Sequence, residues 1–219
     1  MGNCYEKDKR MENSIAYKKL VKQINAVGRE KLDGYYQNTI EEIYDWEREE
    51  VEVLIWNTFH EKKDTDLALF LPKLKSYDGI AALKRMLQEC KIPSRSSVNI
   101  AKVLYDISNK KEYLDILFLN YKEEESNLET VSIIASCKPS EEVYDILVNI
   151  YISNPNSTIR STAADGILYN KGYISNPNDI EEIMRQLELS RKFMKNTVEE
   201  RKKIIAQLEA GNFRQYQIK

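Results

Sequence analysis

The sequence of 219 residues is 42% hydrophobic and 31% charged, and it contains only seven glycines and five prolines. That balance favours long helices around a core and argues against sheets. The 33 basic and 35 acidic residues give a net charge of −2, so the chain lacks the basic excess typical of nucleic-acid-binding proteins.

The sequence also argues against secretion and membrane insertion. No apolar run approaches the ~20 residues of a membrane span, and the charged N-terminus has no apolar h-region. Three cysteines lie far apart without a CxxC pair, which is typical of a reducing compartment. The opening MGNC does not predict N-myristoylation, because Glu6 stands where serine or threonine is needed. We therefore expect a soluble, cytoplasmic protein in which residues 1–10 form a disordered N-terminus.

The first predicted helices lie in the N-terminal third of the chain. Spaced apolar residues predict a helix over 11–27, which Gly28 ends. A second apolar stripe predicts a helical region over 36–62 that no glycine or proline interrupts. This region is either one long helix or two helices that meet near Trp46, and the pattern does not choose between them.

Four acidic residues of that region recur at helical spacing. They are Glu42, Asp45, Glu49 and Glu52. Spacings of 3, 4 and 3 would put the four carboxylates on one face of a helix, roughly opposite the apolar stripe. We interpret this face first as a solvated surface, second as a contact for a basic partner, and last as a catalytic pair. Catalysis comes last because nothing in the sequence indicates the burial that shifts a catalytic pKa.

Two shorter helices are predicted next. Leu67, Phe70, Leu71 and Leu74 follow helical spacing, but Pro72 falls inside the pattern and should kink this helix or delay its start. A turn signal at Tyr77-Asp78-Gly79 then precedes a helix that runs to Cys90.

Over residues 92–173 the same helix signal recurs. Serine-led segments begin at Ser94, Ser126 and Ser157, which are 32 and 31 residues apart. A fixed period of this size indicates a helical solenoid. Each serine is a predicted N-cap, and Ser126 with Glu129 matches a capping box.

The segments between these serine-led helices predict partner helices and turns. Leucine-rich stripes lie around Leu117 and Leu147. The hexapeptide YISNPN, at 151–156 and again at 173–178, predicts turns in which the asparagine before the proline caps the following helix. The serine-led helices also carry small residues that would let a neighbouring helix approach closely: Ala101, Ala135, Ala163, Ala164 and Gly166.

A serine-led helix with alanine at its centre, paired with a leucine-rich helix, resembles a HEAT-type repeat, and the resemblance covers roughly residues 47–173. It implies an all-α fold in which residues 11–176 form a right-handed α–α superhelix that binds partners on its concave face. The repeats are shorter than the ~40–47 residues usual for HEAT. The aspartate and arginine often found between HEAT helices are not regularly placed here.

Residues 177–219 are expected to form a C-terminal helical cap. A heptad pattern runs through Ile180, Met184, Leu187, Arg191, Met194, Val198, Arg201, Ile205 and Leu208. Thr197 and Glu200 offer a capping box that would divide this segment into a helical hairpin. We favour the hairpin cap, and the alternative is a long heptad helix that forms a homodimer through 180–208.

The sequence contains no recognisable catalytic or cofactor motif. Its single histidine, His60, begins HEKKD, which lacks the second ligand of HExxH. Phosphate-binding glycine loops and the GxSxG elbow are absent, so we expect no cofactor, no metal site and no catalysis. Some HEAT-like proteins are DNA glycosylases that use a basic concave face with tryptophan and aspartate. Here Trp46 and Trp56 lie outside residues 92–173, where the helix signal recurs, and the basic face is missing.

The predicted activity is therefore binding of another protein. The candidate contacts on the serine-led helices, which join the four acidic residues above, are Arg95, Asn99, Lys102, Asp106, Glu129, Arg160 and Asp165. Their mixture of signs suits a protein better than a phosphate backbone. Our hypothesis is an inhibitor or immunity-type protein that masks a toxin or an enzyme. The alternatives are a nucleic-acid binder or DNA-glycosylase-like enzyme on the same scaffold, and a self-assembling scaffold protein.

Overall fold

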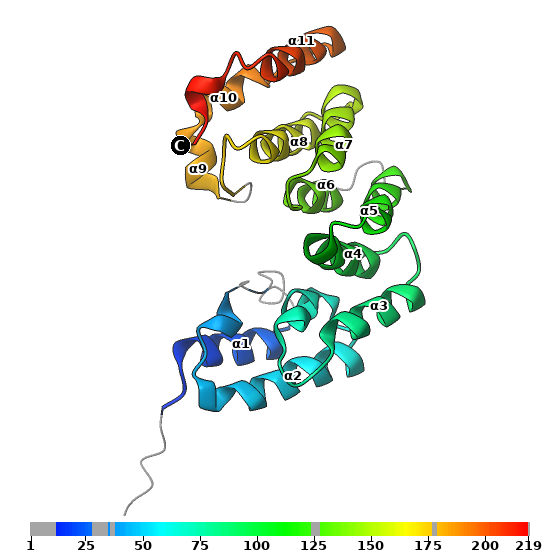
Figure 1. Cartoon of the computed structure of the whole chain (residues 1–219), viewed down its shortest axis with the longest axis vertical. Helices are drawn as coiled ribbons and strands as arrows, with labels where there is room; N and C mark the ends of the chain where they lie inside the picture. Colours follow the sequence, from blue (N-terminus) through cyan, green and yellow to red (C-terminus); the bar gives the residue numbers. More distant parts are fainter. Residues whose placement is uncertain (1–11, 28–34, 36–37, 124–127, 177–178, 219) are drawn as a thin grey trace, which may run out of the picture. The chain divides into compact units, whose positions relative to one another are not determined.

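The computed structural model describes residues 12–27, 35, 38–123, 128–176 and 179–218. Every element of regular structure in these ranges is a helix, which confirms the predicted all-α class (Figure 1). None of these helices combines the length and the apolar composition that crossing a membrane requires. The predicted disordered N-terminus, residues 1–10, lies outside the described residues.

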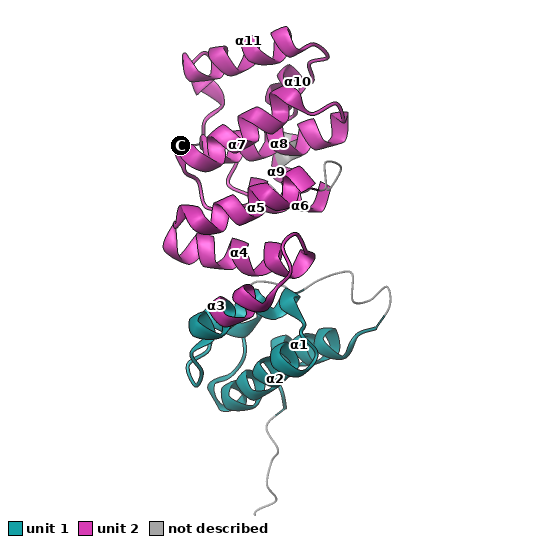
Figure 2. Cartoon of the chain, turned by 90° about the vertical axis from the view of Figure 1, so that its right-hand side faces the viewer, with its two compact units in different colours: residues 1–83 teal, residues 84–219 magenta. Residues whose placement is uncertain are grey.

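The chain divides into two compact units, residues 1–83 (unit 1) and residues 84–219 (unit 2), which Figure 2 shows in separate colours. Helix α3 (Gly79–Glu89) carries the boundary, which falls inside the range 11–176 that the sequence predicts as one array. The other elements of unit 1 are α1 (Ile15–Asn25), α2 (Arg48–Glu61) and the 3₁₀ segments η2 (Thr39–Glu41), η3 (Asp45–Glu47) and η4 (Thr65–Lys73).

Unit 1 has an apolar core to which its α-helices and η4 contribute. Its fully enclosed apolar side chains, one of which lies on η2, are Leu20, Ile40, Val51, Ile55, Phe59, Leu67, Phe70, Leu71 and Leu83. The apolar stripe predicted for 67–74 is therefore buried, but the segment is a 3₁₀ helix rather than an α-helix. Pro72 explains part of this outcome, because in an α-helix its ring would clash with the carbonyl group of Ala68.

The helical region predicted over 36–62 is not one helix, because α2 begins only at Arg48. Just before it, Tyr44 is extended, with φ −71° and ψ 150°, and its amide donates to the Glu47 carboxylate at 2.8 Å. The same carboxylate accepts hydrogen bonds from the amide and the hydroxyl of Ser14, each at 2.7 Å. Glu47 therefore fixes a bend beside Trp46, where one of the two alternatives placed a corner.

Unit 2 consists of helices that contact one another in chain order. They are α4 (Arg95–Ser108), α5 (Lys111–Glu123), α6 (Leu128–Ala135), α7 (Glu141–Ser153), α8 (Ser157–Asn170), α9 (Ile180–Arg185), α10 (Leu187–Lys192), α11 (Val198–Glu209) and the 3₁₀ turn η5 (Arg214–Tyr216). One layer contains α4, α6 and α8, which are the predicted serine-led helices, with α4 against α6 and α6 against α8. The other layer contains α5, α7 and α11, again with successive contacts (Figure 1).

Helices α6 and α8 approach closely because their facing residues are small. A Cβ added to Gly166 would lie 2.6 Å from the Cβ of Ala135 and 3.0 Å from a methyl group of Leu147. Those distances are shorter than atoms in contact allow, so only glycine fits here without a shift of the neighbours. The small residues predicted to permit close approach, Ala101, Ala135, Ala163, Ala164 and Gly166, are all buried.

The N-terminal caps agree with the sequence at one serine-led helix. The Ser94 hydroxyl accepts from the Ser97 amide at 3.1 Å, as predicted for the cap of α4. Ser126, the predicted cap of the second serine-led helix, lies outside the described residues. The buried Asn120 of α5 adds a second support, because its carboxamide oxygen accepts from the Ser94 amide at 2.8 Å.

The capping predicted for the first YISNPN turn was wrong. Asn156 caps α8, since its side chain accepts from the Thr158 amide at 2.9 Å, and Ser157 is already the first helical residue. Asn154, the asparagine before the proline, instead ends α7 and donates through its side chain to the Tyr121 hydroxyl at 3.0 Å. The extended backbone of Asn156 has the geometry of an N-cap, and Asn154 is two residues too early. Part of the second YISNPN lies outside the described residues.

The alternative of one long heptad helix over 180–208 was wrong, because the segment is divided into α9, α10 and α11. Thr197 and Glu200 form the predicted capping box at the start of α11, with the Thr197 amide donating to Glu200 at 3.1 Å. Ile180, Met184 and Met194 of the proposed seam are 75%, 56% and 65% exposed, whereas Arg201, Ile205 and Leu208 are buried. Helix α11 packs against α7.

Candidate binding cleft

A cleft of about 440 Å³ lies between α8 and the segment formed by the end of α10 and the turn after it. All of its walls belong to unit 2. The lining residues are Ser157, Thr158, Arg160, Ser161, Ala164 and Asp165 on one side, and Ser190, Phe193, Met194, Lys195 and Asn196 on the other. A concave site of this volume, with an apolar part and a few polar groups, is typical of a site for a ligand or for a protruding side chain.

The first wall is one face of α8. Ser157, Ser161, Ala164 and Asp165 follow helical spacing, so they lie along the same side of the helix. The opposite side, which includes Gly166, is buried in the close contact with α6. Packing of that buried side fixes the direction in which the cleft residues point.

The second wall, residues 190–196, is held by bonds from two other helices. The Tyr151 hydroxyl of α7 donates to the Phe193 carbonyl at 2.6 Å. The buried Arg201 of α11 donates to the Asn196 carbonyl at 2.9 Å and to the Ile152 carbonyl at 3.0 Å. Both walls are therefore preformed rather than assembled around a ligand.

Asp165 is the chemically unusual group of the cleft. It is half-buried, and no hydrogen bond or ion pair joins it to another of the described residues. Burial raises the pKa of its carboxyl group to about 6, because the protein replaces water around the charged form without supplying a partner. At neutral pH the carboxyl is mainly an unpaired carboxylate.

Ser190 adds a second unsatisfied group to the same cleft. Its hydroxyl oxygen is buried and makes no hydrogen bond within the described part of the chain. Most buried polar groups in proteins are paired, and an unpaired one costs folding free energy. The cleft therefore has an unpaired polar group on each of its two walls.

The structure places the sequence-predicted contacts of the serine-led helices in separate groups. Arg160 and Asp165 line the cleft together. The Arg160 guanidinium, however, donates to the carbonyls of Asn154 at 3.1 Å and Pro155 at 2.6 Å, so it is tied to the turn before α8. Its charge is therefore not paired with that of Asp165.

The predicted contacts on α4 and α6 form ion pairs of their own. Arg95 pairs with Glu129 at 3.2 Å, and both side chains are about half exposed. Lys102 pairs with Asp106, which also accepts from the Lys138 amide at 3.0 Å. Asn99 is half-buried on the same helix and has a bonding partner of its own. Of these predicted contacts, Arg160 and Asp165 are the two that line the cleft of about 440 Å³.

The predicted acidic face on residues 42–52 was wrong. Glu42 and Asp45 precede α2, so they are not on a common helix with the other two, and Glu49 is exposed on α2. Glu52 is fully buried, although its spacing predicted a place on the exposed face. Its carboxylate accepts a hydrogen bond from the Arg48 side chain at 2.7 Å. It also accepts from two backbone amides just after η4, those of Lys75 at 3.0 Å and Ser76 at 2.8 Å.

Burial alone would raise the pKa of Glu52, but these hydrogen bonds outweigh it and lower the pKa to about 2. Glu52 is therefore a structural anion with its bonds already satisfied by its own chain. It has no capacity left for a partner or for acid–base chemistry.

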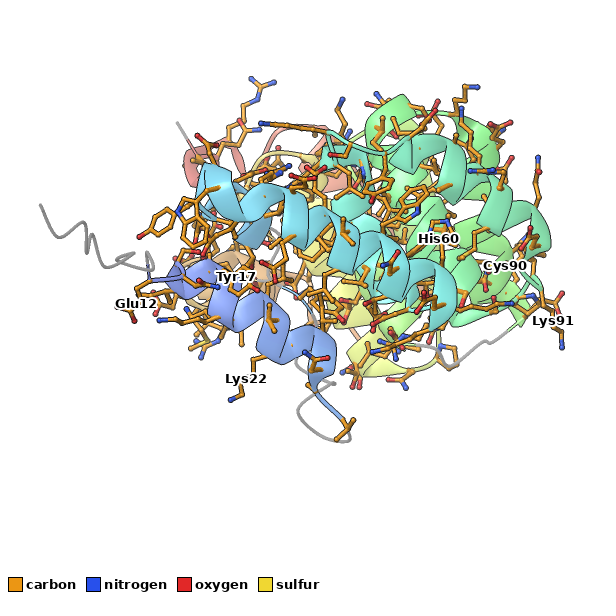
Figure 3. The ribbon with its side chains drawn as sticks, turned by 90° about the horizontal axis from the view of Figure 1, so that it is seen from below. Glu12, Tyr17, Lys22, His60, Cys90 and Lys91 are labelled. Carbon is orange, nitrogen blue, oxygen red and sulfur yellow. The ribbon has the colours of Figure 1, made fainter. Side chains whose placement is uncertain are left out.

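Two other potentially reactive groups of the described residues are Cys137 and His60. The Cys137 thiol is buried, and burial raises its pKa to about 12, so it is not a thiolate at neutral pH. His60 is exposed toward the end of α2, where Figure 3 labels it. In the residue ranges given above, no group of three or more potential ligand side chains is arranged to hold a metal ion.

Sequence reasoning missed the second wall of the cleft. Ser190, Phe193, Lys195 and Asn196 were not among the predicted contacts, and Met194 was assigned to the heptad seam. The capping box at Thr197 was the available signal, because it ends one helix and begins another and so exposes the turn between them. Comparisons with protein-family models, with curated proteins and with solved structures found no match. Function is therefore inferred from the residues of the cleft.

Proposed function

We propose that this chain is a non-enzymatic, cytoplasmic protein that binds another protein, as an inhibitor or immunity-type protein would, and that the cleft beside α8 is part of the contact surface. The observation that carries the proposal is a preformed cleft that is lined by the unpaired carboxylate of Asp165 on one wall and by Ser190, whose hydroxyl is unpaired, on the other. Groups that lower the stability of the free protein and have no internal partner are typical of surfaces selected for binding.

The exposed apolar residue at the mouth of the cleft supports a macromolecular partner. Met194 is 65% exposed and lies beside the buried ring of Phe193. Methionine at a surface is flexible and polarisable, and it is common at protein interfaces. A partner that covered Met194 would gain apolar contact around the polar centre of the cleft.

We also propose that α4 to α8 are the repeats of a HEAT-like, right-handed superhelix. Support comes from the two layers of alternating helices and from the small residues between α6 and α8. In such a stack the layer that contains α4, α6 and α8 would carry the binding surface. In a superhelix each helix pair is rotated relative to the pair before it. An experimental structure of the full chain in which the pairs stack without this rotation would contradict this part of the proposal.

The test of binding uses two matched substitutions of exposed apolar residues. Three purified proteins are each added to lysate of the source cells: the unaltered chain, the Met194→Lys variant and the Ile180→Lys variant. Stoichiometric complexes are then isolated from each mixture. Met194 lies in the cleft and Ile180, at 75% exposure, is not among its lining residues. Neither change removes core packing, so both variants should fold.

We expect a stoichiometric protein partner that binds the unaltered chain and the Ile180→Lys variant but is lost with Met194→Lys. The absence of any stoichiometric partner would contradict protein binding. A partner retained equally by both variants would place the contact surface elsewhere.

A further inference from the structure

The cleft beside α8 already has an ordered shape, so the chemistry of its walls defines what fits in it. Asp165 supplies negative charge on one wall, and Ser190 supplies a hydroxyl oxygen that can accept a hydrogen bond on the other. Ala164, Phe193 and Met194 supply apolar surface between and beside these groups.

The chain does not neutralise Asp165 from within. The other charged side chains that line the cleft, among the residues described, are Arg160 on α8 and Lys195 after α10. Arg160 is bonded to the carbonyls of Asn154 and Pro155, and neither cation forms an ion pair with Asp165. Arg201, which supports the second wall, is likewise occupied by carbonyl oxygens.

We propose that this cleft receives the side chain of a lysine or arginine from the partner protein, with the cationic group against Asp165 and the aliphatic stem along Phe193 and Met194. The inference rests on the proposed function and names the chemistry of its partner. A half-buried carboxylate without a partner gains most from a cation that also donates hydrogen bonds. Lysine and arginine combine such a head with an apolar stem of three or four methylene groups, which the apolar wall would cover.

The same geometry explains why a small anion fits less well. An anion would approach Arg160 and Lys195, but the unpaired carboxylate of Asp165, which lines the same cleft, would repel it. An uncharged aliphatic side chain would cover Met194 and leave Asp165 and Ser190 without partners. A cationic side chain would pair with the carboxylate, donate to the hydroxyl oxygen and cover the apolar wall, while Arg160 stays bonded to the carbonyls before α8.

The test is a titration of the ¹⁵N-labelled full chain, followed by amide chemical shifts. The probes are N-acetyl-lysine amide and N-acetyl-arginine amide, with N-acetyl-norleucine amide as an uncharged stem and inorganic phosphate as an anion. We expect shifts concentrated at Asp165, Ser190 and Asn196 with a cationic probe and not with the other two. Asp165→Asn should weaken the cationic probe about tenfold, whereas Asp145→Asn, at an exposed position of α7, should leave it unchanged.

The pH dependence gives an independent check. Cation binding should weaken as the pH falls from 7 to 5, because protonation removes the charge of Asp165, and Asp165→Asn should abolish this dependence. Equal binding of the norleucine probe, binding of phosphate in place of the cations, or unchanged binding by Asp165→Asn would each overturn the inference. None of these results needs the natural partner. A partner captured through Met194 together with failure of the cationic probes would refute this inference and leave protein binding standing.

Discussion

The two units differ in how they pair the backbone amides that their helices leave free. In unit 1, buried carboxylates do so: Glu47 takes the amides of Ser14 and Tyr44, and Glu52 takes those of Lys75 and Ser76. At the starts of α4 and α7 in unit 2, neutral side chains serve the same purpose. Asn120 accepts from the Ser94 amide, and Ser140 accepts from the Val143 amide.

The difference follows the regularity of the backbone. Unit 1 contains several 3₁₀ segments joined by extended residues, and these leave backbone amides without a helical acceptor. Because a carboxylate has two oxygens, it can accept hydrogen bonds from two or three of these amides at once. A buried carboxylate also accepts backbone amides in unit 2, at a place where the chain is not helical. After α8, the buried Glu182 accepts from the amides of Ser175 at 2.6 Å and Asn176 at 3.1 Å.

The largest expected effect is the loss of a buried carboxylate in unit 1. Glu52→Gln should lower the free energy of unfolding of unit 1 by about 3 kcal/mol, because the half-buried Arg48 loses its partner and two amides lose an anionic acceptor. Both tryptophans of the sequence, Trp46 and Trp56, lie in unit 1, so tryptophan fluorescence during urea unfolding reports on this unit. Glu49→Gln, at an exposed position of the same helix, is the control and should have little effect.

The pH dependence of Glu52 has a defined sign. Its pKa is lowered from 4.5 to about 2, so its contribution to stability is complete above pH 4.5 and is lost as the pH falls through 2. Unit 1 of the unaltered chain should therefore lose stability between pH 4.5 and 2, and Glu52→Gln should lose less over that range. An equal loss in both proteins would show that Glu52 is not the anionic anchor of the unit.

Asp165 in unit 2 should behave in the opposite way. Its pKa is raised from 3.8 to about 6, so the folded chain binds the proton more tightly than the unfolded chain, and stability falls as the pH rises from 3.8 to 6. Asp165→Asn should raise the free energy of unfolding by roughly 2 kcal/mol at pH 7, allowing for partial solvent screening, and by nearly nothing at pH 3.5. Amide hydrogen exchange resolved to α8 would measure the difference. A destabilised Asp165→Asn variant would mean that the carboxylate has a partner inside the protein.

The fold was more predictable from the sequence in unit 2 than in unit 1 for the same physical reason. Apolar spacing and cap residues describe helices that pack on other helices, and α4, with its cap at Ser94, follows that pattern. The spacing of Glu42, Asp45, Glu49 and Glu52 also suggested a helix face, but spacing cannot distinguish a solvated carboxylate from one that accepts buried amides. That distinction depends on contacts between residues more than twenty positions apart.

The cleft was predictable only on one wall. Arg160 and Asp165 were identified because they lie on a helix with a clear sequence signal. The other wall is held by hydrogen bonds from Tyr151 and Arg201 to backbone carbonyls within residues 193–196. Every residue has a backbone carbonyl, so the sequence does not show which of them accept these bonds. The cost of burying Asp165 without a partner is likewise a property of the folded surroundings.

The close contact between α6 and α8 provides a test of regular packing in unit 2. Gly166→Ala should lower the free energy of unfolding by about 1.5 kcal/mol, because the added methyl group would lie 2.6 Å from the Cβ of Ala135 and the resulting shift exceeds the ~1 kcal/mol gain in helix propensity. Adding Ala135→Gly should restore part of the loss, and urea unfolding followed by circular dichroism would show it. Additive losses in the double variant would mean that the two helices do not press on each other at this point.

The smallest expected effect is the loss of Asn120, a neutral side chain that accepts a backbone amide as the charged Glu52 does. Asn120→Ala removes the acceptor of the Ser94 amide, but the Ser97 hydroxyl also lies within reach of that amide, at 3.2 Å. The expected loss is therefore about 1 kcal/mol, measured by hydrogen exchange in α4 and α5, with the exposed Asn212→Ala as control. A loss as large as that of Glu52→Gln would contradict the view that charge makes the anchors of unit 1 stronger. If Asn120→Ala lowers the free energy of unfolding and Asn212→Ala does not, a neutral side chain is enough to stabilise the free amide at the start of a regular helix.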